Sequence, residues 1–91
     1  MFIVNLQLNL FLPYVESLKG RRKIVHSLKE RLSRHNLSIL DLSSEYVKEA
    51  DIAIAFLALN SKAISQKIHT IEDTIQKHFS EIEYSIDYEI L

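Results

Sequence analysis

The chain of 91 residues has no cysteine and no tryptophan, and it has one glycine, one proline and one methionine. The absence of cysteine excludes disulfide bonds, thiol nucleophiles and thiolate metal ligands, and it is typical of proteins from a reducing compartment. The scarcity of glycine and proline indicates a chain built mainly from helices and strands with few special turns. Since 47% of the residues are hydrophobic, we expect an ordered chain.

The sequence also lacks a long apolar run. No segment approaches the roughly 20 apolar residues that a membrane span requires. The first twelve residues lack a basic start and a small-residue cleavage site, and Asn5, Gln7 and Asn9 interrupt them, so they do not resemble a signal peptide. We therefore expect a cytoplasmic protein with no membrane association. A chain of 91 residues suffices for one core between two layers, which predicts a single domain over residues 1–91.

Positive charge is concentrated in one segment, from Ser17 to Arg34. This segment has seven Lys or Arg and one acid, Glu30, so its formal charge is +6 (7 − 1) in a chain whose net charge is −1. Placed on a helix at 100° per residue, the segment has an apolar arc and an opposite cationic arc. The apolar arc consists of Leu18, Ile24, Val25, Leu28 and Leu32, and the cationic arc of Lys19, Arg22, Lys23, Lys29 and Arg34. The pattern predicts an amphipathic helix with one core face.

Two segments alternate with the period of two that is typical of strands buried on one face. In residues 2–12 every even position is apolar, and Pro13, which cannot donate a backbone hydrogen bond, ends the strand. From Ser80 onward the apolar positions are Ile82, Tyr84, Ile86, Tyr88 and Ile90, and the opposite positions are Glu81, Glu83, Ser85, Asp87 and Glu89. The last strand is therefore expected to be acidic on its outer face.

The middle of the chain predicts two more strands and a second helix. Residues 37–43 favour an edge strand with a bulge or an end-of-strand twist near Ile39, and residues 52–59, apolar at every position, favour a strand in the middle of a sheet. The connection over residues 43–50 has no glycine or proline, so either an extended arm or one helical turn would fit. Asn60 or Ser61 can cap a helix whose apolar stripe consists of Ile64, Ile68, Ile71, Ile75 and Phe79.

The order strand, helix, strand, strand, helix, strand predicts an α+β protein with the ferredoxin-like βαββαβ sandwich. In this fold a four-stranded antiparallel sheet carries two helices on one face. We expect the first and third strands in the centre, parallel to each other, and the second and fourth strands at the edges. The same elements could also form a swapped or differently ordered α+β sheet.

The segment SLKGRRKIVHSLKERL, followed by NLSILDL and ADIAIAFLALNSKAISQKI, resembles the YlxP-like proteins, a family of small bacterial domains of unknown function. The most specific part is Ser-Leu-Lys at residues 17–19 with Arg21 and Arg22. The sequence departs from the family pattern at Tyr46, where a tryptophan is usual, and at Ala53, where a glycine is usual. The resemblance implies a ferredoxin-like fold. Because such genes often lie beside those of translation and ribosome-assembly factors, it also implies a link to ribosomal RNA.

Clustered cations at the start of a helix are the arrangement that binds nucleic-acid phosphates. The candidate nucleic-acid-binding residues are Lys19, Arg21, Arg22, Lys23, Lys29 and Arg34. The expected open face of the sheet has amides beside Glu83 and Asp87 in place of the aromatic residues with which RNA-binding sheets stack bases. The residues therefore predict a small protein that binds nucleic acid along its first helix, through phosphates more than bases, and the resemblance implies that ribosomal RNA or the ribosome is the partner. A charged helix face that is merely solvated gives the same pattern.

A homodimeric interaction module without a nucleic-acid role is the alternative. In residues 52–59 one parity serves the core, while Ala53, Ala55, Leu57 and Leu59 leave the other parity apolar as well. An apolar patch on the open face would favour coverage by a second copy of the chain.

Neither a metal site nor a catalytic site is predicted. His26 and His35, and likewise His69 and His78, are nine residues apart, so neither pair shares a helix face. Between the first strand and the first helix, PYVES lacks the glycine-rich loop and the arginine of acylphosphatase-like enzymes, and no Ser-His-acid spacing is evident. Tyr84 and Tyr88 are expected to be packed rings with solvated hydroxyls. We expect a protein that is not an enzyme and has no cofactor.

Overall fold

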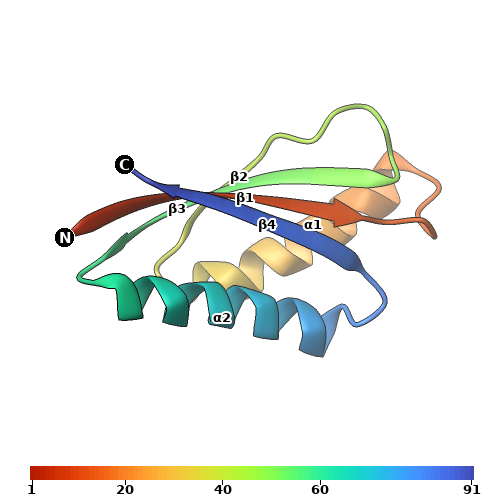
Figure 1. The fold of residues 1–91 in the computed structure, drawn as a ribbon. Helices are drawn as coiled ribbons and strands as arrows, with labels where there is room; N and C mark the ends of the chain where they lie inside the picture. Colours follow the sequence, from red (N-terminus) through yellow and green to blue (C-terminus); the bar gives the residue numbers. More distant parts are fainter.

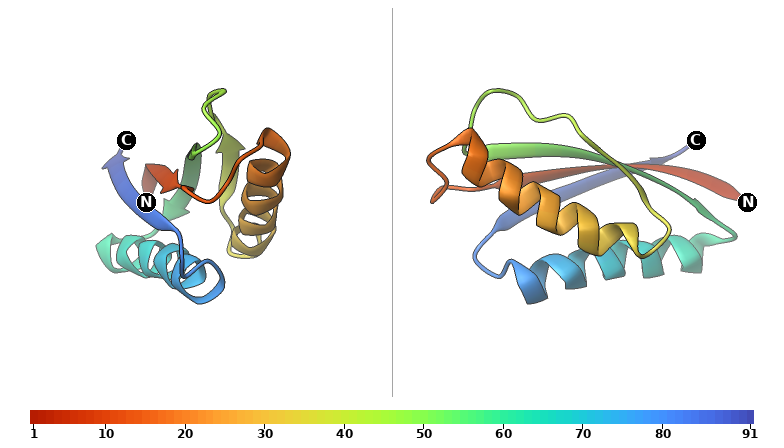
Figure 2. Two further views of the ribbon diagram at one scale, coloured as in Figure 1. Left: turned by 90° about the vertical axis from the view of Figure 1, so that its right-hand side faces the viewer. Right: turned by 180° about the vertical axis from the view of Figure 1, so that it is seen from behind.

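A computed structural model describes residues 1–91 and contains four strands and two helices. In chain order these are β1 (Phe2–Phe11), α1 (Leu18–Ser33), β2 (Ser38–Asp41), β3 (Glu49–Ala58), α2 (Ser61–His78) and β4 (Glu83–Ile90). The strands form one sheet in the order β2-β3-β1-β4, and both helices lie on the same face of it (Figures 1 and 2). The predicted ferredoxin-like βαββαβ sandwich is confirmed, and the differently ordered sheet is excluded.

The two central strands, β1 and β3, run antiparallel, with Val4 opposite Phe56 and Leu8 opposite Ile52. The expectation that they run parallel was wrong. The helical crossover through α1 makes β2 parallel to β1, and the chain then reverses between β2 and β3. Because of that reversal β3 opposes β1, and every neighbouring pair in the sheet is antiparallel.

Both helices begin at side-chain caps. The Ser17 hydroxyl accepts a hydrogen bond from the backbone N–H of Gly20 at 3.0 Å, and the Asn60 amide oxygen accepts one from Ala63 at 2.9 Å. After α1 the backbone of Asn36 takes a positive φ of 57°, the left-handed conformation that commonly follows a helix end. These caps place the helix starts within one residue of the prediction.

The structure of β2 and β3 differs from the prediction. β3 starts at Glu49, three residues before the predicted Ile52, because Glu49 and Asp51 occupy positions that face away from the core and tolerate charge. The four residues of β2 pair with β3 in a regular register, so the bulge predicted near Ile39 is absent. The connection between these strands is an extended arm that ends in a turn at residues 47–48.

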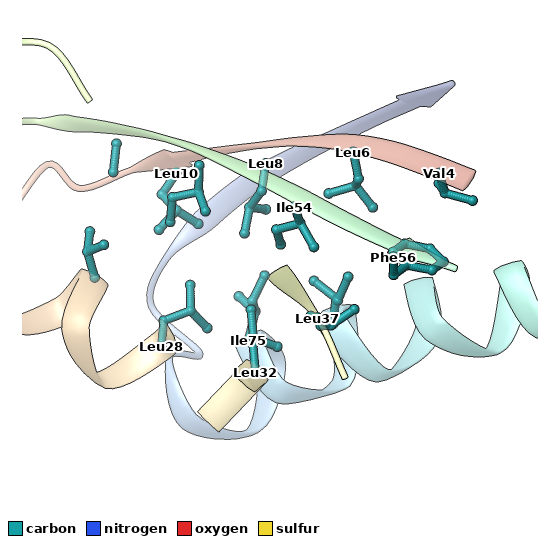
Figure 3. Packing of buried hydrophobic residues seen from close by; sticks show 14 of the residues in the cluster. Val4, Leu6, Leu8, Leu10, Leu28, Leu32, Leu37, Ile54, Phe56 and Ile75 are labelled. Carbon is teal, nitrogen blue, oxygen red and sulfur yellow. The ribbon is translucent and has the colours of Figure 1, made fainter. Parts of the chain in front are cut away.

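A single hydrophobic core lies between the sheet and the two helices. Seventeen buried residues form it, and the even residues of β1, from Val4 to Leu10, are each no more than 1% exposed. Side chains from β1 and β3 point toward those of α1 and α2 (Figure 3). The residues expected in one core, Leu8, Leu28, Leu32, Phe56 and Ile71, all belong to it, and Ile68 packs against it.

Three residues predicted on core-facing positions are more exposed than expected. Leu18, in the first turn of α1, is 36% exposed, and on the edge strand β4 Tyr88 is 52% and Ile90 48% exposed. Tyr84 is packed against the core as predicted, and its hydroxyl is bonded to Gln76 and Glu72 on α2. Neither helix combines the length and the apolar composition that crossing a lipid bilayer requires.

Replacing Leu28 by alanine is expected to lower the free energy of unfolding by about 2–5 kcal/mol, because the buried side chain would leave a cavity. The measurement is urea denaturation followed by circular dichroism. Leu59→Ala is the control, since Leu59 is 82% exposed and its truncation should change stability by no more than about 0.5 kcal/mol. Equal losses in the two variants would contradict the position of the core.

Candidate nucleic-acid interface

α1 presents a row of exposed cations on the side that faces away from the sheet. We call this row the basic stripe, and its members are Lys19, Arg22, Lys23, Lys29 and Arg34. From Lys19 to Arg34 the row covers about 22 Å of helix at 1.5 Å per residue. A nucleic-acid strand carries one phosphate about every 3.4 Å along a duplex axis, so the stripe is long enough to contact several phosphates.

None of the five cations is paired with an acid. Lys77 forms an ion pair with Asp73 at 3.2 Å, and His26 Nε2 lies 3.3 Å from a carboxylate oxygen of Glu30; neither contact includes a Lys or Arg of α1. Glu30, the single acid of α1, therefore faces a histidine and leaves the lysines and arginines free for an external anion. Since the rest of the chain carries −7 (−1 − 6), the charge of the molecule is strongly separated.

Arg21 does not lie with the other five predicted residues. It is 6% exposed, and its guanidinium Nη1 donates hydrogen bonds to the backbone oxygens of Tyr46 at 2.7 Å and Glu49 at 3.2 Å. Its guanidinium is therefore committed to the backbone and does not join the basic stripe, contrary to the prediction. The spacing of Leu18, Arg21, Val25, Leu28 and Leu32 is 3, 4, 3, 4, so the sequence itself placed Arg21 on the core side of α1.

The connection between β2 and β3 is tied to the start of α1 through Arg21 and a second cation. The Lys48 ammonium donates to the backbone oxygens of Pro13 at 2.8 Å and Val15 at 3.1 Å, and the Lys48 oxygen accepts from Leu12 at 2.8 Å. Three connections thus meet at one end of the sheet, which we call the loop end: residues 12–17, 42–48 and 79–82 (Figure 1). These bonds fix the loop that leads into the basic stripe.

The open face of the sheet has a different character on each side of β1. Asn5, Gln7 and Asn9 form the middle row, as expected, and their neighbours on β4 include Asp87 and Glu89. On the other side, β3 and β2 place apolar side chains on the same face, with Leu40 opposite Ala53. The acidic half of the open face would repel phosphate groups.

Solved structures that are similar to this chain show that it has a ferredoxin-like fold. The de novo designed protein LFR1 1, with ferredoxin fold, shares 14% identity at a TM-score of 0.63, covering 99% of this chain and 85% of that one. The designed protein Foldit4 shares 12% identity at a TM-score of 0.62, with 96% of each chain covered. A dimeric ferredoxin-like protein from an uncultured marine organism shares 14% identity at a TM-score of 0.54, covering 100% of this chain and 94% of that one.

At the level of sequence, residues 3–88 match the family model DUF503, described as a protein of unknown function. The chain belongs to this family. The predicted membership in a family of uncharacterised small proteins is thereby confirmed, and the narrower YlxP-like assignment stays a prediction. No curated protein matches the chain.

Replacing Arg21 by alanine is expected to lower the free energy of unfolding by about 1.5–3 kcal/mol, because two backbone oxygens would lose bonds to a charged donor. Urea denaturation measures the loss, and amide hydrogen exchange at Leu12 should accelerate as the loop end loosens. Arg22→Ala, at the exposed neighbouring position, serves as the control and should change stability by no more than about 0.5 kcal/mol. An Arg21→Ala variant as stable as the control would show that these bonds contribute nothing to the fold.

Proposed function

We propose that this protein binds RNA phosphates through the basic stripe of α1 and that ribosomal RNA, free or in the ribosome, is its partner in the cytoplasm. The observation that carries the proposal is the row of five exposed cations with no anionic side chain paired to them. Exposed cations that neutralise phosphates release counterions from the nucleic acid, and this release drives binding without sequence preference. The role requires no chemical step, so the proposed protein is a binding protein and not an enzyme.

The separation of charge supports this orientation. A molecule with a net charge of −1 repels RNA weakly as a whole, so binding depends on presenting the +6 segment and keeping the acidic strand away. The two layers provide this separation, because α1 covers the opposite face of the sheet from Asp87 and Glu89. Arg21 is left out of the proposed contact set because its guanidinium already bonds two backbone oxygens.

The affinity for a single-stranded ribosomal RNA fragment is expected to fall with salt. Contacts to about three to five phosphates give a slope of roughly −2 to −4 in log affinity against log salt concentration, at about −0.7 per phosphate. The slope is measured by fluorescence anisotropy at salt concentrations from about 50 to about 300 mM. Absence of salt-sensitive binding to the fragment and to purified ribosomes would refute the proposed function.

Charge reversals on the two helices test whether RNA binds to the basic stripe itself or responds only to the net charge of the protein. Arg22→Glu with Lys23→Glu should weaken binding to every RNA alike, whereas Lys62→Glu with Lys77→Glu on α2 should weaken it much less. Each double variant lowers the net charge by four, from −1 to −5, so the pair is matched in total charge. Stability should change little, since exposed charges contribute little to folding. Equal losses of affinity in the two doubles would show that α1 has no special role.

A homodimeric interaction module is the second candidate function, favoured by the exposed apolar side chains of the open face. We call them the apolar strip, and its members are Ile3, Leu40, Ala53, Ala55 and Leu57. Leu40 is 59% exposed and Leu57 is 58% exposed. A ferredoxin-like protein with a dimeric structure supports this candidate by analogy. If the two open faces covered each other completely, Asp87 and Glu89 of one copy would face the same acids of the other. The two copies would therefore meet only through the half of the face that β2 and β3 form.

In this dimer the sheets pack face to face and α1 points outward in both copies, so dimerisation and RNA binding are compatible. Sedimentation velocity at increasing concentration should show a monomer–dimer equilibrium in the micromolar range, and Leu40→Asp with Leu57→Asp should leave only monomer. Leu18→Asp, on the helical layer, is the control and should dimerise as the wild type does. A wild-type protein that stays monomeric at several hundred micromolar would exclude the module.

A further inference from the structure

An apolar pocket opens at the loop end, beside the start of the basic stripe. Its volume is about 280 Å³, and seven of the eleven residues that line it are hydrophobic. This volume lies just below the range of roughly 300–1,000 Å³ that is usual for small-molecule sites, so the pocket suits one flat ring system better than a larger ligand.

Three aromatic residues from separate segments are among those that line this pocket. Phe11 ends β1, Tyr14 lies in the loop before α1, and Phe79 follows α2. Phe11 lies on the open-face side of β1, so Tyr14, which is 81% exposed, is the exposed aromatic residue at the pocket. Exposed aromatic rings beside a positively charged surface are the usual means by which single-stranded nucleic acids are held, since each base can stack on a ring whatever its identity.

The pocket and the basic stripe share α1. Ile24 lines the pocket, and Lys23, the residue before it, belongs to the stripe. Successive residues are 100° apart on a helix about 10 Å wide, so an anion at Lys23 and a ring beside Ile24 are separated by no more than the width of α1. Phosphate and base of one nucleotide can therefore be held at the same time.

The other charged groups at the pocket orient a nucleotide. Glu81 and His78 line the side of the pocket opposite α1, and Glu81 would repel a phosphate there. The same carboxylate can accept hydrogen bonds from the amino groups at the edge of a base. Phosphates are thus directed to the side of Lys23 and the base to the side of Glu81. A second hollow shares Tyr14 and Glu81 with the pocket and is also lined by Lys48, Glu49 and Glu83. Because the Lys48 ammonium already bonds two backbone oxygens, the three acids make this hollow a poor site for a nucleotide.

We infer that this pocket receives an unstacked base of a single-stranded RNA whose phosphates lie along the basic stripe. The inference rests on the proposed function and adds a ligand class to it. A duplex does not satisfy the site, because its bases are paired and stacked inside an A-form helix whose deep major groove excludes side chains. The pocket thus selects single strands, whereas the stripe alone does not.

The test compares binding of a ten-nucleotide oligoadenylate, an RNA duplex and inorganic polyphosphate to the wild type and to Tyr14→Ala. Loss of one stacked base corresponds to about 1–3 kcal/mol, so Tyr14→Ala should weaken oligoadenylate binding by roughly 5- to 150-fold. Binding of the duplex and of polyphosphate, which offer no free base, should stay within about twofold. Tyr46→Ala is the matched control, since Tyr46 stands at the loop end but outside the pocket and lines the second hollow instead.

Each outcome decides a different point. If the wild type binds all three ligands and Tyr14→Ala binds oligoadenylate as tightly as the wild type, the base pocket is refuted and the phosphate-binding stripe stands. Equal weakening of all three ligands by Tyr14→Ala would refute it too, because the effect would then not concern a base. A larger effect of Tyr46→Ala would place the base in the second hollow. If the wild type binds none of the ligands, both the pocket and the proposed function fail.

Discussion

Burial of one face of β1 is the constraint on which the rest of the molecule depends. Val4, Leu6, Leu8 and Leu10 are each no more than 1% exposed, and the strand pairs on both sides, with β3 and with β4. Since side chains alternate along a strand, this burial fixes the amide row on the opposite face. It also requires both helices to cover the same face, because that face alone is apolar throughout. α1 then has one side against the sheet and its cations outside.

At the loop end, charged side chains stabilise the connections by hydrogen bonds and so hold the candidate site in place. Arg21 and Lys48 have no acidic partner, and each instead donates to two backbone oxygens of neighbouring connections. Bonds of this kind satisfy carbonyl groups that strands and helices leave without partners. They join the connection after β2 to the loop that contains Tyr14. The pocket and the first turns of the basic stripe therefore share one framework.

The elements with strong periodicity were predictable, and those determined by distant contacts were not. Alternation in β1 and the stripe of α2 gave these elements nearly their observed bounds, because each one buries a single face, whereas β4 starts at Glu83, three residues after the predicted Ser80. Counting the charge of α1 without its spacing assigned Arg21 to the surface, although it stands on the 3-4-3-4 stripe. Leu18 was assigned to the core because a helix projection ignores where the sheet ends. The pocket is lined by Phe11 from the end of β1 and by Tyr14 and Phe79 from two connections, and no local pattern indicates that these residues meet.

The pairing of β1 with β4 also bears on the order in which the chain can fold during synthesis. Val4 lies opposite Ile90 and Phe11 opposite Glu83. During synthesis, β1 therefore cannot pair along this edge until β4, the last strand, has left the ribosome. Until β4 emerges, β1 has one unpaired edge, and unpaired edges are templates for aggregation. β4 then covers this edge and replaces it with one on which acids alternate with apolar residues. The most vulnerable nascent chain is therefore the one that ends just before Glu83, and the strand that completes the sheet also protects it.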